Sequence, residues 1–227
     1  MYLSASHECA DTLDVVNLEP AITPGLFITF EGGEATGKTT QSKILAERIG
    51  ALWTREPGGT ELGAVLREVC LGERFDPSSL TELLLMAADR SHHVESMIRP
   101  TLLRGNSVVC DRYSASTIAY QGAGRGLALD VVSTVAKVAE NGLHPDITVV
   151  IDVDDELRHS RLVARGGADR LEKAGAEFHA RVAQSFRDQA ASDPAMVVVD
   201  GSGSIDEVAS RVWDAIGDRV TSRVAFV

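Results

Sequence analysis

The residue types with the clearest chemistry lie in residues 32–40, Gly-Gly-Glu-Ala-Thr-Gly-Lys-Thr-Thr. Gly32, four further residues and then Gly37-Lys38-Thr39 match the pattern GxxxxGK[ST]. Glycines let backbone N–H groups turn toward one point, and the helix that follows presents its positive end to that point. The lysine of such a loop reaches the β- and γ-phosphates of a nucleotide, and the next hydroxyl can bind Mg²⁺. The spacing therefore predicts a nucleotide phosphate site rather than a plain strand-to-helix turn.

A phosphate-binding loop alone is compatible with a nucleotide kinase, a hydrolase motor or a GTPase switch. The sequence lacks the Asn-Lys-x-Asp signature of guanine recognition, which disfavours a GTPase. Asp111, after the apolar run Val-Val-Cys, is followed by Arg112 and not by the second acid that water-activating hydrolases often carry. A kinase instead needs arginines that hold an acceptor phosphate in line with the donor. The candidates are Arg55, Arg67, Arg90 and Arg112, and for each the alternative is a solvated charge or a structural ion pair.

Strands must alternate with helices to position these side chains. Short apolar, β-branched runs predict strands at 26–32, 52–54, 106–111, 146–153 and 195–200. Helical spacing and capping residues predict helices at 38–50, 60–72, 79–104, 114–121, 127–141, 155–165, 176–191 and 204–220, with the glycine-rich residues 122–126 separating two of them. This order predicts an α/β fold with a parallel sheet and helices on both faces, and places Arg55 and Arg112 at the ligand-binding edge.

Composition limits the class of protein further. The 227 residues suffice for one domain, expected at 25–227, after an acidic and poorly ordered extension at 1–24. The net charge of −11 argues against a nucleic-acid binder or a membrane-surface binder. The three cysteines, Cys9, Cys70 and Cys110, have no metal-site spacing, which favours a reduced, cytoplasmic protein. No apolar run is long enough to predict a membrane span.

Five stretches together resemble bacterial thymidylate kinase. They are FEGGEATGKTT, TREPGGT, AADRSHHVESMIRP, DRYSASTIAYQGAGRG and ARGGADRLE, in that order, and the likeness runs from about residue 26 to about residue 220. The resemblance implies the P-loop nucleoside monophosphate kinase fold, with a five-stranded parallel sheet, a small mobile lid at about 163–175 and a homodimer. It also implies transfer of the γ-phosphoryl group of ATP to dTMP with Mg²⁺, for dTTP synthesis.

The resemblance assigns the phosphate-handling residues. The ATP-binding residues would be Gly32, Gly33, Glu34, Ala35, Thr36, Gly37, Lys38, Thr39 and Thr40. Thr39 and Asp111 would hold Mg²⁺, while Arg67 and Arg112 would clamp the dTMP phosphate. Glu34 would also reach the sugar 3′-hydroxyl, since a carboxylate is ill suited to a phosphate. The alternative is that the Glu34 side chain points to solvent.

The resemblance also assigns the base and sugar contacts. Arg90 would donate to thymine O4 and Thr117 would meet N3. Tyr120 would fill the space of a ribose 2′-hydroxyl and so select deoxyribose. Gln121 belongs to the same segment, and Met86 stands where the family commonly has a phenylalanine that stacks on thymine. For Tyr120 and Met86 the alternative is a core residue.

Members of this family carry a catalytic arginine either in the P-loop or in the lid. Residues 33–36 contain none, whereas 158–170 contains Arg158, Arg161, Arg165 and Arg170. Arg165 is the expected catalytic arginine, with Lys38 and Arg112, because two glycines beside it provide a hinge. We expect Arg170 to pair with Asp169 or Glu172 if it is not catalytic, and Arg158 and Arg161 to face solvent.

Two departures keep other functions open. Ala35-Thr36 replaces the family's usual Gly-Ala, and Met86 replaces the aromatic residue. The alternatives are a kinase for another nucleoside monophosphate and a catalytically inactive P-loop nucleotide-binding module.

Overall fold

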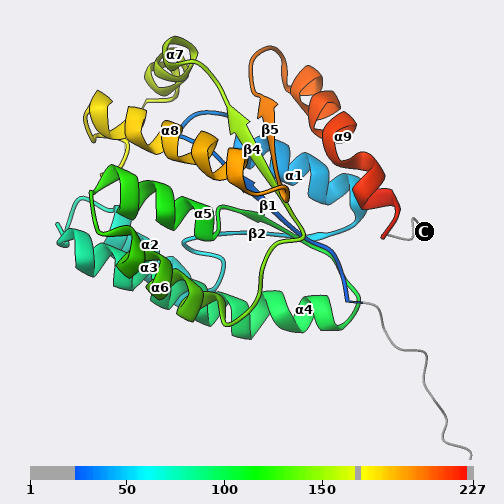
Figure 1. Cartoon of the computed structure of the whole chain (residues 1–227), viewed down its shortest axis with the longest axis horizontal. Coiled ribbons are helices and arrows are strands. Elements are labelled where there is room, and N and C mark those ends of the chain that lie inside the picture. Colours follow the sequence, from blue (N-terminus) through cyan, green and yellow to red (C-terminus); the bar gives the residue numbers. More distant parts are fainter. Residues whose placement is uncertain (1–23, 167–169, 224–227) are drawn as a thin grey trace, which may run out of the picture.

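The computed structural model describes residues 24–166 and 170–223. Its centre is a parallel five-stranded sheet with the order β2-β3-β1-β4-β5 (Figure 1). The strands are β1 (Phe27–Glu31), β2 (Leu52–Arg55), β3 (Val108–Asp111), β4 (Ile147–Asp152) and β5 (Met196–Asp200). The predicted strands and parallel sheet are therefore confirmed. The predicted extension at 1–24 lies almost wholly outside the described residues.

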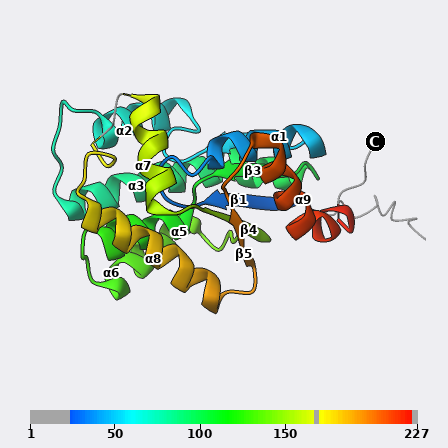
Figure 2. The ribbon, with the colours of Figure 1, turned by 90° about the horizontal axis from the view of Figure 1, so that it is seen from above.

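Helices cover both faces of the sheet. They are α1 (Lys38–Ile49), α2 (Glu61–Leu71), α3 (Ser79–His93), α4 (Arg99–Leu103), α5 (Ser114–Thr117), α6 (Leu129–Glu140), α7 (Asp155–Arg165), α8 (Ala176–Ser192) and α9 (Ile205–Thr221). Figure 1 and Figure 2 show α1 and α9 side by side, with α6 and α8 across the strands from them. Apolar residues of α1 and α9 form one core with β1 and β4, and α8 belongs to a second core on the opposite face. No helix of the described chain is both long enough and apolar enough to cross a bilayer.

The predicted helix at 79–104 is helical throughout but changes its pitch. A wider, π-type stretch, η1 (Val94–Ile98), joins α3 to α4. The N–H of Arg99 donates to the carbonyl of Val94, five residues earlier. Pro100 explains the change, because it has no N–H and its ring would clash with the carbonyl four residues before it.

The glycine-rich separator predicted at 122–126 is wrong in its first half. Another π-type stretch, η2 (Ile118–Gly124), continues directly from α5. A Cβ atom on Gly124 would lie 2.6 Å from the ring of Phe178. The glycine there serves close packing of η2 on α8, so it does not end the helix.

Candidate active site

The phosphate loop joins the end of β1 to the start of α1. Gly32 and Gly37 have φ angles of 134° and 98°, which only glycine adopts freely. A Cβ atom on Gly32 would lie 2.3 Å from the carbonyl oxygen of Ile151. Lys38 begins α1, is 5% exposed, and donates through Nζ to the carbonyl of Gly33 at 2.7 Å. The loop thus closes on the lysine side chain that the sequence assigned to phosphate binding.

Two oxygen side chains meet beside this loop. The register of β1 and β3 pairs Phe30 with Asp111, which brings Asp111 to the mouth of the loop. The Thr39 hydroxyl donates to Oδ2 of Asp111. Among the described residues, the buried Oδ1 of Asp111 has no hydrogen-bond partner. Hard oxygen ligands and an unused carboxylate oxygen suit Mg²⁺, so the residues present fit the ion that the sequence predicted.

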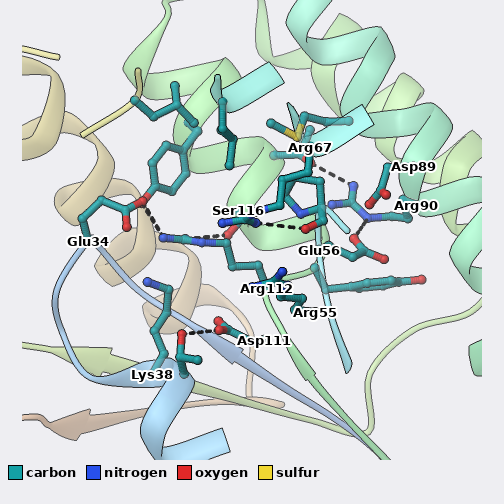
Figure 3. A pocket seen from close by; sticks show the side chains of 18 of the residues that line it. Glu34, Lys38, Arg55, Glu56, Arg67, Asp89, Arg90, Asp111, Arg112 and Ser116 are labelled. Atoms are coloured by element: carbon teal, nitrogen blue, oxygen red, sulfur yellow. Dashed lines mark hydrogen bonds and ion pairs between the residues drawn. The ribbon is translucent and has the colours of Figure 1, made fainter. Parts of the chain in front are cut away.

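Arg112 links the phosphate loop to the neighbouring pocket. Its backbone is left-handed, with φ of 72°, and its Nη1 donates to the Gly32 carbonyl at 3.0 Å and to the Ser116 hydroxyl at 3.1 Å. Its Nη2 donates to Oε1 of Glu34 at 2.6 Å and to the Tyr120 hydroxyl at 3.0 Å (Figure 3). The guanidinium therefore sits between the donor loop and the pocket where an acceptor phosphate is expected.

Glu34 points into the site and not to solvent. Besides its ion pair with Arg112, it accepts a hydrogen bond from the Tyr120 hydroxyl at 2.8 Å. Burial raises the pKa of Glu34, but the charges of Arg112 and Lys38 outweigh burial and bring the pKa to about 2. The carboxylate is therefore ionised and can accept a hydrogen bond from a sugar hydroxyl.

A buried carboxylate, that of Glu31, helps to fix the position of Arg112. Glu31 accepts from the Tyr113 N–H at 2.8 Å and from the Ser116 hydroxyl at 2.5 Å. Burial raises the pKa of Glu31 to about 7, against the opposing effects of Ser116 and Arg112. Because Ser116 also accepts from Arg112, Glu31 fixes the turn after β3 that carries the arginine.

A second ion pair fixes the wall where the base is expected. Arg90 is 3% exposed and donates to Glu56 at 2.8 Å and to the Thr117 hydroxyl at 2.8 Å. The other oxygen of Glu56 lies 3.0 Å from Nδ1 of His93, whose Nε2 lies 2.7 Å from the Thr54 hydroxyl. The guanidinium of Arg90 is thereby held in one orientation beside Thr117, as a group that recognises a base edge requires.

These groups surround one pocket. Its lining includes the predicted residues Glu34, Lys38, Thr39, Arg67, Met86, Arg90, Asp111, Arg112, Thr117, Tyr120, Gln121 and Arg165. Arg67 reaches it from α2 while donating to the Pro57 carbonyl at 2.9 Å. Figure 3 shows Lys38 and Asp111 at one end of this pocket, with Arg90 and Asp89 at the other. The structure thus brings together side chains from the phosphate loop, α1, α2, α3, β3, η2 and the lid.

A second hollow lies on the other side of the phosphate loop. It is lined by Ala35, Thr36, Gly37, Thr40, Gln41, Arg161, Gly201, Gly203, Ser204, Ile205 and Val208. Arg161 donates to the carbonyls of Thr36 at 3.2 Å and Gly201 at 3.0 Å. Arg158 is mostly covered and pairs with Asp155. The expectation that Arg158 and Arg161 face solvent is therefore wrong, because α7 turns this face toward the loop.

The lid arginines have different partners. Arg165 lines the main pocket and pairs with Glu172. Arg170 pairs with Glu82 on α3, and its guanidinium also donates to the Cys70 carbonyl at 2.9 and 3.0 Å. Arg170 therefore pairs with Glu82 and not with Glu172, which was one of its two expected partners. Asp169, the other alternative, lies outside the described residues, as does the rest of 167–169.

Four residues that shape the site were not predicted as site residues from the sequence. They are Glu56, Glu82, Ser116 and Arg161. One signal was available for Arg161, because positions 158, 161 and 165 have the spacing of a single helix face. Glu56 directly follows a strand end, the same signal that identified Arg55 and Arg112. No comparable signal marks Glu82, whose partners are distant in the sequence.

A phosphate loop beside a pocket lined by several arginines is typical of one class of protein, the P-loop kinases that phosphorylate a small acceptor. The family model described as Thymidylate kinase matches residues 30–212. The chain therefore belongs to the thymidylate kinase family.

Named relatives agree with that assignment. Thymidylate kinase of Synechococcus sp. (strain JA-2-3B'a(2-13)) is 48% identical over 86% of this chain and 96% of its own length. That of Deinococcus radiodurans is 44% identical over 87% of this chain and 99% of its own. The crystal structure of thymidylate kinase from Ehrlichia chaffeensis matches with a TM-score of 0.70 and 36% identity, covering 84% of this chain and 98% of that chain. The fold predicted from the sequence is therefore confirmed.

Proposed function

We propose that this chain transfers the γ-phosphoryl group of ATP to dTMP and that the residues of the main pocket bind dTMP. The observation that carries the proposal is the position of Arg112. Its guanidinium touches the carbonyl of Gly32 in the donor loop and the side chain of Glu34 in the acceptor pocket. A clamp shared by both sites holds two phosphates close together, which is the main requirement of phosphoryl transfer.

On the donor side, the loop N–H groups and Lys38 bind the phosphates of ATP. Thr39 and Asp111 would hold Mg²⁺, which neutralises developing charge on the phosphates when it is bound. The hollow beside Arg161 accommodates the adenine, because a planar guanidinium can stack on an aromatic base.

On the acceptor side, Arg67 and Arg112 bind the dTMP phosphate. Glu34 accepts a hydrogen bond from the 3′-hydroxyl, and Tyr120, packed on Phe178 and Phe186, closes the space of a 2′-hydroxyl. Arg90 and Thr117 address the thymine edge, with Gln121 beside them.

A coupled assay of ADP release with dTMP, dUMP, dGMP and dCMP tests the choice of acceptor. We expect dTMP to give by far the highest kcat/KM. A higher value for another nucleotide would support the alternative kinase, and no ADP release with any of them would support the inactive binding module. Since ATP and nucleoside monophosphates are cytoplasmic metabolites, we place the enzyme in the cytoplasm.

Met86→Phe should lower the KM for dTMP by less than about tenfold and keep the preference for dTMP over dUMP. Met86 lines the pocket one helical turn before Arg90 and packs against the core around Tyr120. Sulfur–aromatic contacts are worth about 0.3–1.5 kcal/mol, and aromatic pairs about 0.5–1.5 kcal/mol beyond burial. Because these ranges overlap, a ring at position 86 should make the surface that binds the base more rigid but change the affinity for dTMP only modestly. Steady-state kinetics with both nucleotides measures the effect.

Met86→Ala is the control for this substitution. If Met86 touches the base, the truncation raises the KM for dTMP. A folded Met86→Ala enzyme with both KM values unchanged would show that Met86 is a core residue only.

We propose that the outer surface of α2, α3 and α6 forms the interface of a homodimer. These helices pack side by side, yet they leave several large apolar side chains 44–74% exposed: Leu62, Val65, Leu80, Leu84, Leu129, Val131 and Val138. Leu62 and Val65 on α2, and Leu80 and Leu84 on α3, thus lie on the outside of the chain. Large apolar side chains exposed on neighbouring helices of a single chain mark a contact site, and a twofold axis would bury them against their copies in a second chain.

Leu84→Glu should weaken the homodimer by about a hundredfold or more, because a twofold interface would bury the new charge twice. Sedimentation velocity over a range of protein concentrations measures the shift to monomer. Leu103→Glu is the matched control, since Leu103 is 62% exposed on α4, outside this surface. An unchanged dimer in Leu84→Glu, or a wild-type chain that sediments as a monomer, would contradict the proposed interface.

A further inference from the structure

Glu82 on α3 is a buried carboxylate at the meeting point of three segments. It is 0% exposed and accepts from Nε2 of Gln121 at 2.8 Å and from Arg125 at 3.0 and 3.3 Å. Its second oxygen also accepts from Arg170, the first residue of the lid segment 170–174, which we call the lid arm. The donors therefore come from the acceptor pocket, from the end of η2 and from the lid arm.

We infer that Glu82 is a positioning residue that couples the lid arm to the acceptor-base pocket. The inference rests on the proposed function, since it concerns how tightly dTMP binds. Nothing in the reaction requires Glu82 to touch a substrate. Its effect would pass through Gln121 on one side and through Arg170 on the other.

On the pocket side, Glu82 sets the orientation of an amide. Gln121 is 2% exposed and lines the acceptor pocket. Because its Nε2 donates to Glu82, the amide cannot rotate without breaking a hydrogen bond to a charged group, which is stronger than a neutral one. The amide oxygen is then the polar atom of Gln121 that remains free to face the acceptor pocket, beside Thr117. Glu82 also shares one face of α3 with Met86 and Arg90, at successive i, i+4 positions.

On the lid side, Glu82 fixes a residue that does not itself line the pocket. Arg170 is held by Glu82 and by the carbonyl of Cys70, and its N–H donates to the carbonyl of Leu71 at 3.3 Å. The next two residues, Leu171 and Glu172, do line the pocket. Glu172 pairs with the expected catalytic residue Arg165. Glu82 thus holds Arg170, and Arg170 lies two residues before Glu172, the partner of Arg165.

Electrostatics explains why a carboxylate is needed at this position. Two guanidinium groups, of Arg125 and Arg170, converge on Glu82. Burial raises the pKa of Glu82, but hydrogen bonds from Arg125, Gln121 and Arg170 outweigh burial and lower it below the ordinary value. A neutral amide of the same shape would leave the two arginines without their shared charge and would compete with Gln121 as a donor. Both the lid arm and the side-chain amide of Gln121 should then become more mobile.

The test compares Glu82→Gln with Glu73→Gln. Glu73 also meets the lid arm, through an exposed ion pair with Lys173, so it is a matched control for charge and location. We expect Glu82→Gln to raise the KM for dTMP by about tenfold, as the loss of a hydrogen bond to a charged group implies. The KM for ATP should change by less than about twofold, because the hollow beside the phosphate loop shares no residue with the Glu82 network. Glu73→Gln should leave both KM values within about twofold.

Hydrogen exchange gives a readout that does not depend on turnover. In the wild type, dTMP should slow exchange of the backbone amides of Arg170–Ala174, and this protection should be lost in Glu82→Gln but kept in Glu73→Gln. A folded Glu82→Gln protein with unchanged dTMP KM and unchanged protection would overturn the inference. Wild-type activity toward dTMP is measured first, so that a failure of the proposed function is distinguished from a failure of the coupling.

Arg170→Gln keeps the inference testable if Glu82→Gln does not fold. It should raise the KM for dTMP although Arg170 does not line the acceptor pocket. In a foldable double variant, the effects of Glu82→Gln and Arg170→Gln should be less than additive, because both break the same connection. Fully additive effects, or an Arg170→Gln enzyme with wild-type KM for dTMP, would contradict the coupling.

Discussion

Replacing Lys38 with alanine should lower kcat for dTMP phosphorylation by about a hundredfold or more, while the protein stays folded. Lys38 is almost fully buried in the phosphate loop, where burial lowers the pKa of its ammonium group. A bound polyphosphate would bring negative charge to this ammonium group and so favour its charged form. Loss of a positioned charge that stabilises the transition state typically costs two to three orders of magnitude in rate. Steady-state kinetics, together with a thermal melt, measures the effect.

Lys43→Ala is the control for this substitution. Lys43 lies on the same helix, is exposed, and rests over the ring of Trp53 at 4.6 Å from the centroid. It should lose almost no activity. Near-normal activity of the Lys38→Ala enzyme would count decisively against the role assigned to the loop.

Arg165→Ala should lower kcat more than it raises the KM for dTMP, with a fall in kcat of about tenfold to a hundredfold. Arg165 ends α7, lines the acceptor pocket and pairs with Glu172. A guanidinium that arrives with the lid stabilises the charge spread over the transferring phosphoryl group, so its contact is strongest in the transition state. Single-turnover kinetics separates this chemical step from product release.

Two other arginines serve as comparisons. Arg161→Ala should act mainly on the KM for ATP, because Arg161 borders the hollow on the donor side. Arg170→Ala should act mainly on the KM for dTMP, as the Glu82 connection implies. If Arg165→Ala is silent and Arg170→Ala lowers kcat, the catalytic arginine has been misassigned.

The sheet and the phosphate loop were predictable because their signals are local. A β-branched run such as Phe27–Glu31, followed by glycines with positive φ and a helix, is determined by neighbouring residues. The position of Asp111 at the loop follows from parallel pairing of β1 with β3, which places both strand ends at one edge. Arg112 follows it in the chain and is therefore carried to the same place.

The remaining part of the site depends on contacts between distant segments. Glu82 meets Arg170, which lies 88 residues away, and the orientation of α7 turns Arg161 toward Thr36 across 125 residues. No local pattern encodes such pairs. The apolar residues of α2 were equally ambiguous, because helical spacing identifies an apolar face without saying whether this chain or a partner covers it. Leu62 and Val65 are left on the surface.

Transfer of an isotopic label tests the central claim most directly. The enzyme is incubated with dTMP and ATP labelled in its γ-phosphoryl group, and the products are separated and identified. The structure predicts that the label appears in the β-phosphoryl group of dTDP, in an amount equal to the ADP formed, and that Lys38→Ala suppresses this product. Label recovered as inorganic phosphate without labelled dTDP would show that the loop serves hydrolysis, and would contradict a clamp in which Arg112 holds donor and acceptor together.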